Sequence, residues 1–236
     1  MSTHGKLIAI EGIDGSGKRT QLGLLVQELK SLGVPLFRIS FPCYESTFGQ
    51  LVARYLNGDF GALDAVDPHL SAILYAGDRF EAKPRLEAEL AAGRNVLADR
   101  YVPSNLAHQT ARLPAKEREA FLRWLRHIEY EIYRLPAEDL VLYLRLPVAQ
   151  AHDLIARKPA RDYTNLPRDI QEADLRHLEN ASKVYDQLSK GPRWRIIECV
   201  DPVAKTLRPP EDISSEVFTA VARVLGLESK SRGSAS

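Results

Sequence analysis

Short hydrophobic runs along this chain alternate with longer segments whose apolar residues recur at helical spacing. The short runs are rich in Leu, Ile and Val, as expected for buried strands. Because such strands alternate with helices, the pattern predicts an α/β fold in which helices cover a parallel sheet. The expected strands are residues 6–12, 35–41, 95–100, 139–146 and 193–200.

The longer segments are expected to be helices. Residues 18–33 place Leu22 and Leu29 on one face and end at a glycine. Residues 68–93 form a long helical region that tolerates Pro84 only at a kink or a joint. The remaining helical segments are 47–61, 114–135 and both ends of 148–190, whose middle is charged and broken by prolines.

Composition indicates one soluble domain. A chain of 236 residues can bury a single large core, so we expect one domain over residues 1–228 and a small, polar, disordered tail over 229–236. The 32 basic and 31 acidic residues nearly cancel, which gives no reason to expect a nucleic-acid or membrane partner. Without a signal peptide, a membrane helix or a disulfide framework, a cytoplasmic location is expected.

The stretch GIDGSGKRT, residues 12–20, carries the first chemical signal. Its glycines allow a tight turn whose N–H groups point at one anion, and the lysine adds a full positive charge. A simple turn is the alternative reading, but the GxxxxGK spacing is complete and lies between a strand and a helix. The residues expected at the ATP phosphates are Gly12, Gly15, Ser16, Gly17, Lys18, Arg19 and Thr20.

Arg19 departs from this pattern, because Ser or Thr at that point normally gives its hydroxyl to Mg²⁺. Thr20 comes one residue late. Either the metal depends on other ligands, or Arg19 points away and the ion is held by phosphates, water and a carboxylate. A third reading makes Arg19 a solvated residue on the first helical turn.

Four motifs occur in a characteristic order: IEGIDGSGKRTQ at 10–21, SFPCYEST at 40–47, LYAGDRFE at 74–81 and LADRYVPSNLAHQ at 97–109. Together they resemble the thymidylate kinases, P-loop enzymes that transfer a phosphoryl group from ATP to dTMP. The resemblance spans most of the chain. It implies a three-layer P-loop kinase fold with a five-stranded parallel sheet and a lid, and it makes Arg19 a variant found in a bacterial subgroup.

The resemblance also implies how the sugar of the acceptor is bound. Asp14 matches a family acid near the sugar and the acceptor phosphate. Phe41, Pro42 and Tyr44 match a segment that lies over the deoxyribose. An aromatic ring near the 2′ carbon would disfavour a ribose hydroxyl. Phe41 could equally be a core residue.

The base and the acceptor phosphate involve a second set of matches. Tyr75 matches an aromatic residue that stacks on thymine, and Arg79 and Arg100 match arginines on the acceptor phosphate. Asn105 matches a residue at the base edge, and His108 stands where the family often has an aromatic residue near the base or sugar. Tyr75 could instead be a core aromatic, but its spacing from Arg79 puts both on one helical face.

Asp99 stands at the end of the third strand, where P-loop proteins place a carboxylate for the magnesium shell. Asp14 is a second candidate ligand. A surface ion pair between Asp99 and Arg100 is the alternative reading. Mg²⁺ and the donor ATP are the expected cofactors.

The lid implied by the resemblance covers about residues 156–172. Some thymidylate kinases carry a catalytic arginine in the P-loop, where this chain has Gly15 and Ser16. Transition-state charge would then be stabilised by Arg157 or Arg161. The resemblance further indicates Arg168, Asp169 and Glu172 in the lid; the expected catalytic set is Asp14, Lys18, Arg100, Arg157 and Arg161.

The resulting hypothesis is a dTMP kinase that forms dTDP and ADP. A related kinase of another nucleotide and a non-catalytic nucleotide-binding paralogue are the alternatives. The family usually forms homodimers through its helices, and the apolar faces around Ile73 and Leu86 or in residues 121–133 are candidates for that interface.

Overall fold

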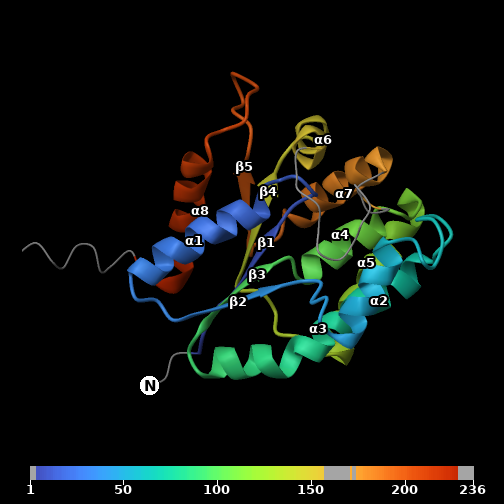
Figure 1. Ribbon diagram of the computed structural model, residues 1–236, viewed down its shortest axis with the longest axis horizontal. Coiled ribbons are helices and arrows are strands. Elements are labelled where there is room, and N and C mark those ends of the chain that lie inside the picture. Colours follow the sequence, from blue (N-terminus) through green and yellow to red (C-terminus); the bar gives the residue numbers. More distant parts are fainter. Residues whose placement is uncertain (1–3, 157–170, 172–173, 228–236) are drawn as a thin grey trace, which may run out of the picture.

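A parallel sheet of five strands forms the centre of the molecule, in a computed structural model that describes residues 4–156, 171 and 174–227 (Figure 1). The strand order is β2-β3-β1-β4-β5. All five strands predicted from the hydrophobic runs are confirmed, together with the α/β class. They are β1 Leu7–Glu11, β2 Leu36–Ser40, β3 Asn95–Asp99, β4 Leu140–Arg145 and β5 Trp194–Glu198.

The middle of the sheet is buried on both faces. Every residue of β1 is buried, as is β4 up to Leu144. This burial on both faces explains why residues 7–10 and 140–144 form continuous hydrophobic runs rather than alternating with polar residues. In register, Ile10 of β1 lies beside Asp99 of β3 and Leu142 of β4. The carboxyl ends of these three strands therefore meet at one edge, where α/β proteins bind ligands.

Helices cover both faces of the sheet (Figure 1). On one face α1 packs against α8, and on the other α4 packs against α3 and α7. The helices are α1 Lys18–Ser31, α2 Thr47–Leu56, α3 Pro68–Ala91, α4 Val102–Thr110, α5 Ala115–Arg126, α6 Val148–Ala156, α7 Leu175–Leu188 and α8 Pro210–Leu225, with a π-helix η1 at His127–Ile132.

One helical prediction needs correction and another becomes more specific. Pro84 was expected only at a kink or a joint, and helix α3 is continuous through it, so it does not lie at a joint between two helices. The proline removes the hydrogen bond to the carbonyl of Phe80, a residue that is 47% exposed, so water can satisfy that carbonyl. The segment 114–135, expected as one amphipathic helix, changes from α5 to the wider η1 at His127.

Helix α8 follows the last strand and was not predicted. It has recognisable signals: a proline at its first position, two acids in the first turn, and buried Ile213, Val217 and Val221 at spacings of four. The tail from residue 228 lies outside the described residues. Among the described helices, none has the length and apolar character needed to cross a membrane.

Candidate active site

The loop after β1 has the conformation that its glycines were expected to allow. Gly12, Gly15 and Gly17 all have positive φ, at 145°, 86° and 84°. A Cβ on Gly12 would lie 2.7 Å from the carbonyl oxygen of Leu144, and one on Gly15 would lie 2.4 Å from that of Ala151. The loop is therefore packed against the end of β4 and against α6, and only glycine fits at both points.

Lys18 begins α1, and its side chain folds back over this loop. The Nζ atom donates to the carbonyl oxygens of Gly12 and Ile13, at 2.9 Å each. Gly17 caps α1 without a side-chain hydrogen bond, so the first N–H groups of the helix face the loop uncapped by a side chain. An anion placed here meets these N–H groups, the positive end of the helix and the ammonium group together.

The other P-loop residues divide by exposure. Arg19 and Thr20 are exposed on the first turn of α1, which agrees with the reading of Arg19 as a solvated residue. Ser16 is buried, and its hydroxyl makes no hydrogen bond within the described part of the chain. Cys199 lies below the loop, with its thiol 4.0 Å from the carbonyl oxygen of Ser16.

Arg100 reaches the same loop from the end of β3. Its Nη2 donates to Asp14 Oδ1 at 2.6 Å, and its Nη1 lies 3.2 Å from the Gly12 carbonyl oxygen and 3.0 Å from Ser104 Oγ. Burial lowers the pKa of Arg100, but Asp14 and other nearby acids outweigh it, and the net pKa lies well above the ordinary value. Arg100 and Asp14, which the resemblance placed near the same acceptor phosphate, thus lie in contact at the glycine-rich loop after β1.

A carboxylate not anticipated from the sequence supports this turn. Glu11, at the end of β1, is fully buried and accepts from Tyr101 N at 2.7 Å, Ser104 Oγ at 2.6 Å and Tyr185 Oη at 2.8 Å. Burial raises its pKa, and the hydrogen bonds partly offset that rise. Arg100 has a φ of 65°, so Glu11 fixes the backbone immediately after a strained residue.

His108 lies behind Arg100 and links α4 to α7. Its Nε2 is 3.3 Å from Arg100 Nη1, and its Nδ1 is 3.2 Å from His177 Nε2. The arginine can only donate, so His108 accepts at Nε2 and, when neutral, donates from Nδ1 to His177. Burial lowers the pKa of both rings, that of His177 to about 4. The pair is therefore neutral at physiological pH.

Arg79 lies apart from Arg100, in a buried group around Glu129. Its Nε donates to Glu129 Oε2 at 3.1 Å and its Nη2 to Oε1. Asn105 donates from Nδ2 to the Ala72 carbonyl oxygen at 3.0 Å and to Glu129 Oε1 at 2.8 Å. The structure thus groups Arg79 with Asn105, a candidate for the base edge, through their shared contact with Glu129.

The segment after β2 is held by α3. Asp78 accepts from Cys43 N at 3.0 Å and from Ser46 Oγ at 2.8 Å, and the Phe41–Pro42 peptide is cis. Phe41 is 5% exposed and packs on Tyr101, with ring centroids 5.7 Å apart. The contacts of Phe41 favour the core reading for this residue.

Tyr44 and Tyr75 are only partly buried, and they pack on a small cluster formed by Val52, Tyr55 and Leu56. The rings of Tyr75 and Tyr55 meet edge to face at 6.2 Å. Tyr55 lies on α2, Tyr75 lies on α3 about one helical turn before Arg79, and Tyr44 lies in the loop before α2. The partial exposure of Tyr75 leaves room for the stacking role expected of it.

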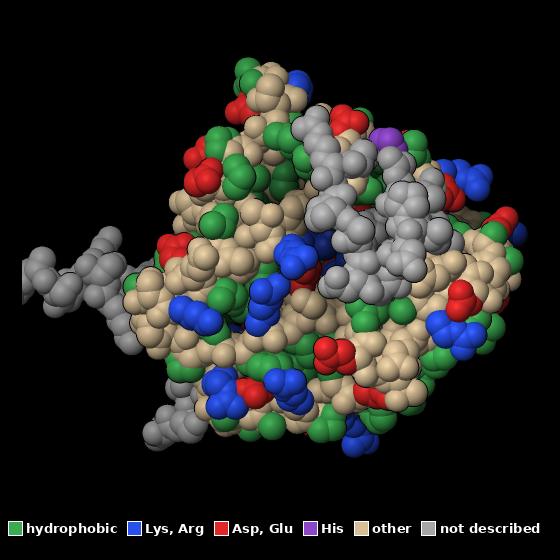
Figure 2. Space-filling view, viewed as in Figure 1, with side chains coloured by type: hydrophobic (Ala, Val, Ile, Leu, Met, Phe, Trp, Pro, Cys, Tyr) green, Lys and Arg blue, Asp and Glu red, His purple; other side chains and the backbone are tan. Residues whose placement is uncertain are grey.

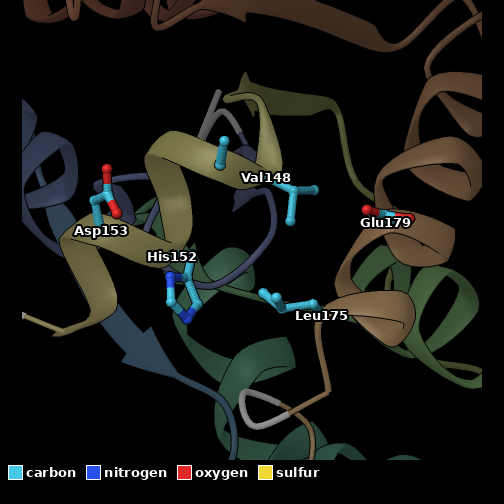
Figure 3. Close-up of a pocket in the computed structure, with 6 residues that line it drawn as sticks. Val148, His152, Asp153, Leu175 and Glu179 are labelled. Atoms are coloured by element: carbon cyan, nitrogen blue, oxygen red, sulfur yellow. The ribbon is translucent and has the colours of Figure 1, made fainter.

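A cavity of about 340 Å³ opens between α6 and α7, away from these groups. His152 and Leu175 point toward each other across it (Figure 3). Its lining residues are Val148, Ala149, His152, Asp153, Leu175 and Glu179. None of the acceptor residues predicted from the sequence lines this cavity.

Basic side chains gather near the middle of the face that Figure 2 shows, with an acidic side chain between them. Asp99, the predicted metal ligand, is partly buried at the end of β3. Among the described residues no group of three His, Cys, Asp or Glu side chains forms a metal site.

The lid residues Arg157, Arg161, Arg168, Asp169 and Glu172 lie outside the described residues.

Comparison with known proteins places the chain in a family. The model of the family described as Thymidylate kinase matches residues 10–208. The chain belongs to the thymidylate kinase family. It is 32% identical over 212 residues to thymidylate kinase of Mycobacterium tuberculosis, covering 87% of this chain and 98% of that protein. It is 31% identical to a probable thymidylate kinase of Thermococcus onnurineus over 223 residues, 92% of this chain and 98% of that one.

The fold is shared with the solved structure of thymidylate kinase from Candida albicans. The TM-score is 0.73 at 22% identity, over 96% of this chain and 94% of the other. The family, the P-loop kinase fold and the enzyme class predicted from the four motifs, dTMP kinase, are confirmed.

Proposed function

We propose that this chain transfers the γ-phosphoryl group of ATP to dTMP, which yields dTDP and ADP. The observation that carries the proposal is the place of Arg100, whose guanidinium is held beside the P-loop by Asp14 and the Gly12 carbonyl. A donor phosphate on the loop and an acceptor phosphate on this arginine would face each other.

The donor phosphates would occupy the P-loop. Lys18 gives up its contacts to the carbonyls of Gly12 and Ile13 and moves its charge to the β and γ phosphates. The N–H groups of the loop and of the first turn of α1 donate to the same oxygens. Arg19 is exposed on the first turn of α1.

The acceptor phosphate would bind to Arg100, whose planar fork matches two phosphate oxygens. Asp14 and the Gly12 carbonyl fix the guanidinium before substrate arrives, so little ordering remains to be done at the moment of transfer. The attacking phosphate oxygen is already ionised, so the reaction needs positioning and positive charge rather than a strong base.

Magnesium fits the carboxylates that are present. Mg²⁺ usually keeps several waters and takes one or two protein carboxylates together with substrate phosphates. Asp14 and Asp99 both act electrostatically on Arg100, so two carboxylates lie near the site without forming a protein cage. Bound there, the ion would neutralise charge on the transferring phosphates.

The base would bind between Tyr75 and Asn105. Both hydrogen-bond partners of Asn105 Nδ2 are acceptors, the Ala72 carbonyl and the Glu129 carboxylate, so the amide nitrogen faces them. Asn105 Oδ1 is then a buried acceptor that has no hydrogen-bond partner in the described residues. It suits the N3–H of thymine, and the matching atom of cytosine carries no hydrogen.

The remaining parts of the proposal rest on the family resemblance. A lid over residues 156–172 would supply Arg157 or Arg161 to the transferring group, with Arg168, Asp169 and Glu172 as further lid residues. The chain would work in the cytoplasm as a homodimer of single-domain subunits, using its exposed helical faces. Phe80, exposed on α3 and 4.7 Å from the ring of Tyr133, lies on such a face.

The test is steady-state release of ADP with dTMP, dUMP, dCMP, dAMP and dGMP as acceptors. The proposal predicts that dTMP has the highest kcat/KM. If another monophosphate is clearly better, the enzyme is a kinase of a different nucleotide. Binding of ATP without turnover on any acceptor would instead indicate a non-catalytic protein.

A further inference from the structure

Glu129 occupies the centre of the buried group that includes Arg79 and Asn105, and the proposed reaction gives it no role. It is 0% exposed and is the buried residue of the π-helix η1. Its Oε1 accepts from both Arg79 and Asn105, and its Oε2 accepts from Arg79. One carboxylate therefore holds two side chains that come from different helices, α3 and α4.

The π-helix places this carboxylate where it is. Regular helix α5 ends at Arg126, and the wider turn of η1 directs Glu129 inward while Glu131 and Ile132 remain exposed. The turn closes with a hydrogen bond from Tyr133 N to the Ile128 carbonyl at 2.9 Å. Single π-turns in otherwise α-helical segments often occur at functional sites.

The contacts leave two defined hydrogen-bonding atoms. Asn105 Nδ2 is committed to Glu129 and the Ala72 carbonyl, which leaves Oδ1 as an acceptor. Arg79 uses Nε and Nη2 on Glu129, and its Nη1 makes no hydrogen bond within the described ranges. An acceptor and a charged donor are thus oriented by the same carboxylate.

We infer that Glu129 is a positioning residue that sets the preference for thymine over cytosine, an inference that rests on the proposed function. Thymine presents a donor at N3 and an acceptor at O4. Cytosine presents an acceptor at N3 and a donor at N4. If Glu129 were replaced by a neutral group that could also donate a hydrogen bond, the Asn105 amide could flip. Its nitrogen rather than its oxygen could then face the base, and the site would no longer present a defined acceptor beside the Arg79 donor.

The experiment compares Glu129→Gln with Glu138→Gln. Glu138 is a matched control, because it is also buried, at 5% exposure, and accepts from Tyr130 rather than from Arg79 or Asn105. Values of kcat/KM for dTMP and dCMP are measured for each variant and for the unmodified enzyme, together with the melting temperature.

For Glu129→Gln the dTMP to dCMP ratio should fall by about tenfold or more, mainly through a higher KM for dTMP, since positioning acts on ground-state and transition-state binding alike. For Glu138→Gln the ratio should stay within about twofold of the unmodified enzyme. If Glu129 merely stabilises the fold, its loss lowers the melting temperature and both activities together. An unchanged ratio therefore overturns the inference.

Two further measurements keep this test decisive. Glu129→Asp retains the charge that Arg79 needs but is one methylene shorter, so it should fold and still lower the ratio; a normal ratio in this variant contradicts the inference even if Glu129→Gln does not fold. Calorimetric binding of dTMP and dCMP without ATP tests the same preference independently of turnover. If the unmodified enzyme does not phosphorylate dTMP, the proposed function fails, while the binding ratio still decides the role of Glu129.

Discussion

Single buried polar residues, each held by partners from distant parts of the chain, determine the geometry of this site. Glu11 joins β1 to Tyr185, which is 174 residues away, and to Ser104, which is 93 residues away. Asp78 holds the loop after β2 in the same way. Each of these carboxylates is satisfied by hydrogen bonds, which offset the cost of its burial. Substitutions at such positions are expected to act on the site and on stability together.

Gly15 provides a test at the scale of one residue. Gly15→Ala should destabilise the protein by about 1–3 kcal/mol and raise the KM for ATP, because φ is 86° and the new methyl group would lie 2.4 Å from the Ala151 carbonyl oxygen. Gly23→Ala is the matched control, since a methyl group there meets nothing within 4 Å. In the helix interior it should stabilise by roughly 0.5–1 kcal/mol. Urea unfolding measures the stability of each variant, and steady-state kinetics measure its KM for ATP. Equal effects of the two substitutions would argue against this account of the loop.

At the scale of elements, the contact between α4 and α7 connects Arg100 to the start of α7. His108 on α4 contacts Arg100 and His177, and His177 lies at the start of α7, where Asp174 accepts from its backbone N–H at 3.0 Å. Residues 172–173, just before that helix, lie outside the described residues. The two neutral imidazole rings therefore connect the start of α7 to Arg100, so a shift of α7 would also move the contact that His108 makes with Arg100.

This contact predicts a pH dependence. Burial lowers the pKa of His177 from 6.5 to about 4. Between these values the unfolded chain binds a proton that the folded protein does not, so the His177 contribution to stability is intact above pH 6.5 and is lost as the pH falls toward 4. The loss amounts to about 1.4 kcal/mol per pH unit in the middle of that range. His177→Gln should remove this slope.

The measurement is the free energy of unfolding from urea titrations at several pH values. Glu138 has the opposite effect on stability, because burial raises its pKa from 4.5 to about 7. Between these pH values the folded protein holds a proton on Glu138 that the unfolded chain has lost, so this contribution to stability decreases as the pH rises. The difference in the free energy of unfolding between His177→Gln and the unmodified protein, taken at each pH, isolates the contribution of the histidine. A curve for His177→Gln parallel to that of the unmodified protein would contradict the assignment.

At the scale of the whole molecule, sequence patterns predicted five parallel strands and some of the residues at the carboxyl edge of the sheet, but not the order of the strands within the sheet. Asp14 and Arg100 come from motifs that directly follow β1 and β3, and neighbouring parallel strands bring such residues together. Glu11 and Glu129 could not be assigned this way. Glu11 stands out only as a charge at the end of an apolar run, and Glu129 depends on a π-turn that has no recognisable sequence signal.

The most direct test of the whole account follows the label from [γ-³²P]ATP in the presence of dTMP and Mg²⁺. The account predicts label in dTDP with the unmodified enzyme. With Arg100→Lys, kcat/KM for dTMP should be lower by about 10²-fold or more, because lysine keeps the charge but loses the fork on the acceptor phosphate. Arg195→Lys, whose side chain is 58% exposed, should behave like the unmodified enzyme. Absence of label from dTDP, or an unaffected Arg100→Lys variant, would contradict the central claim.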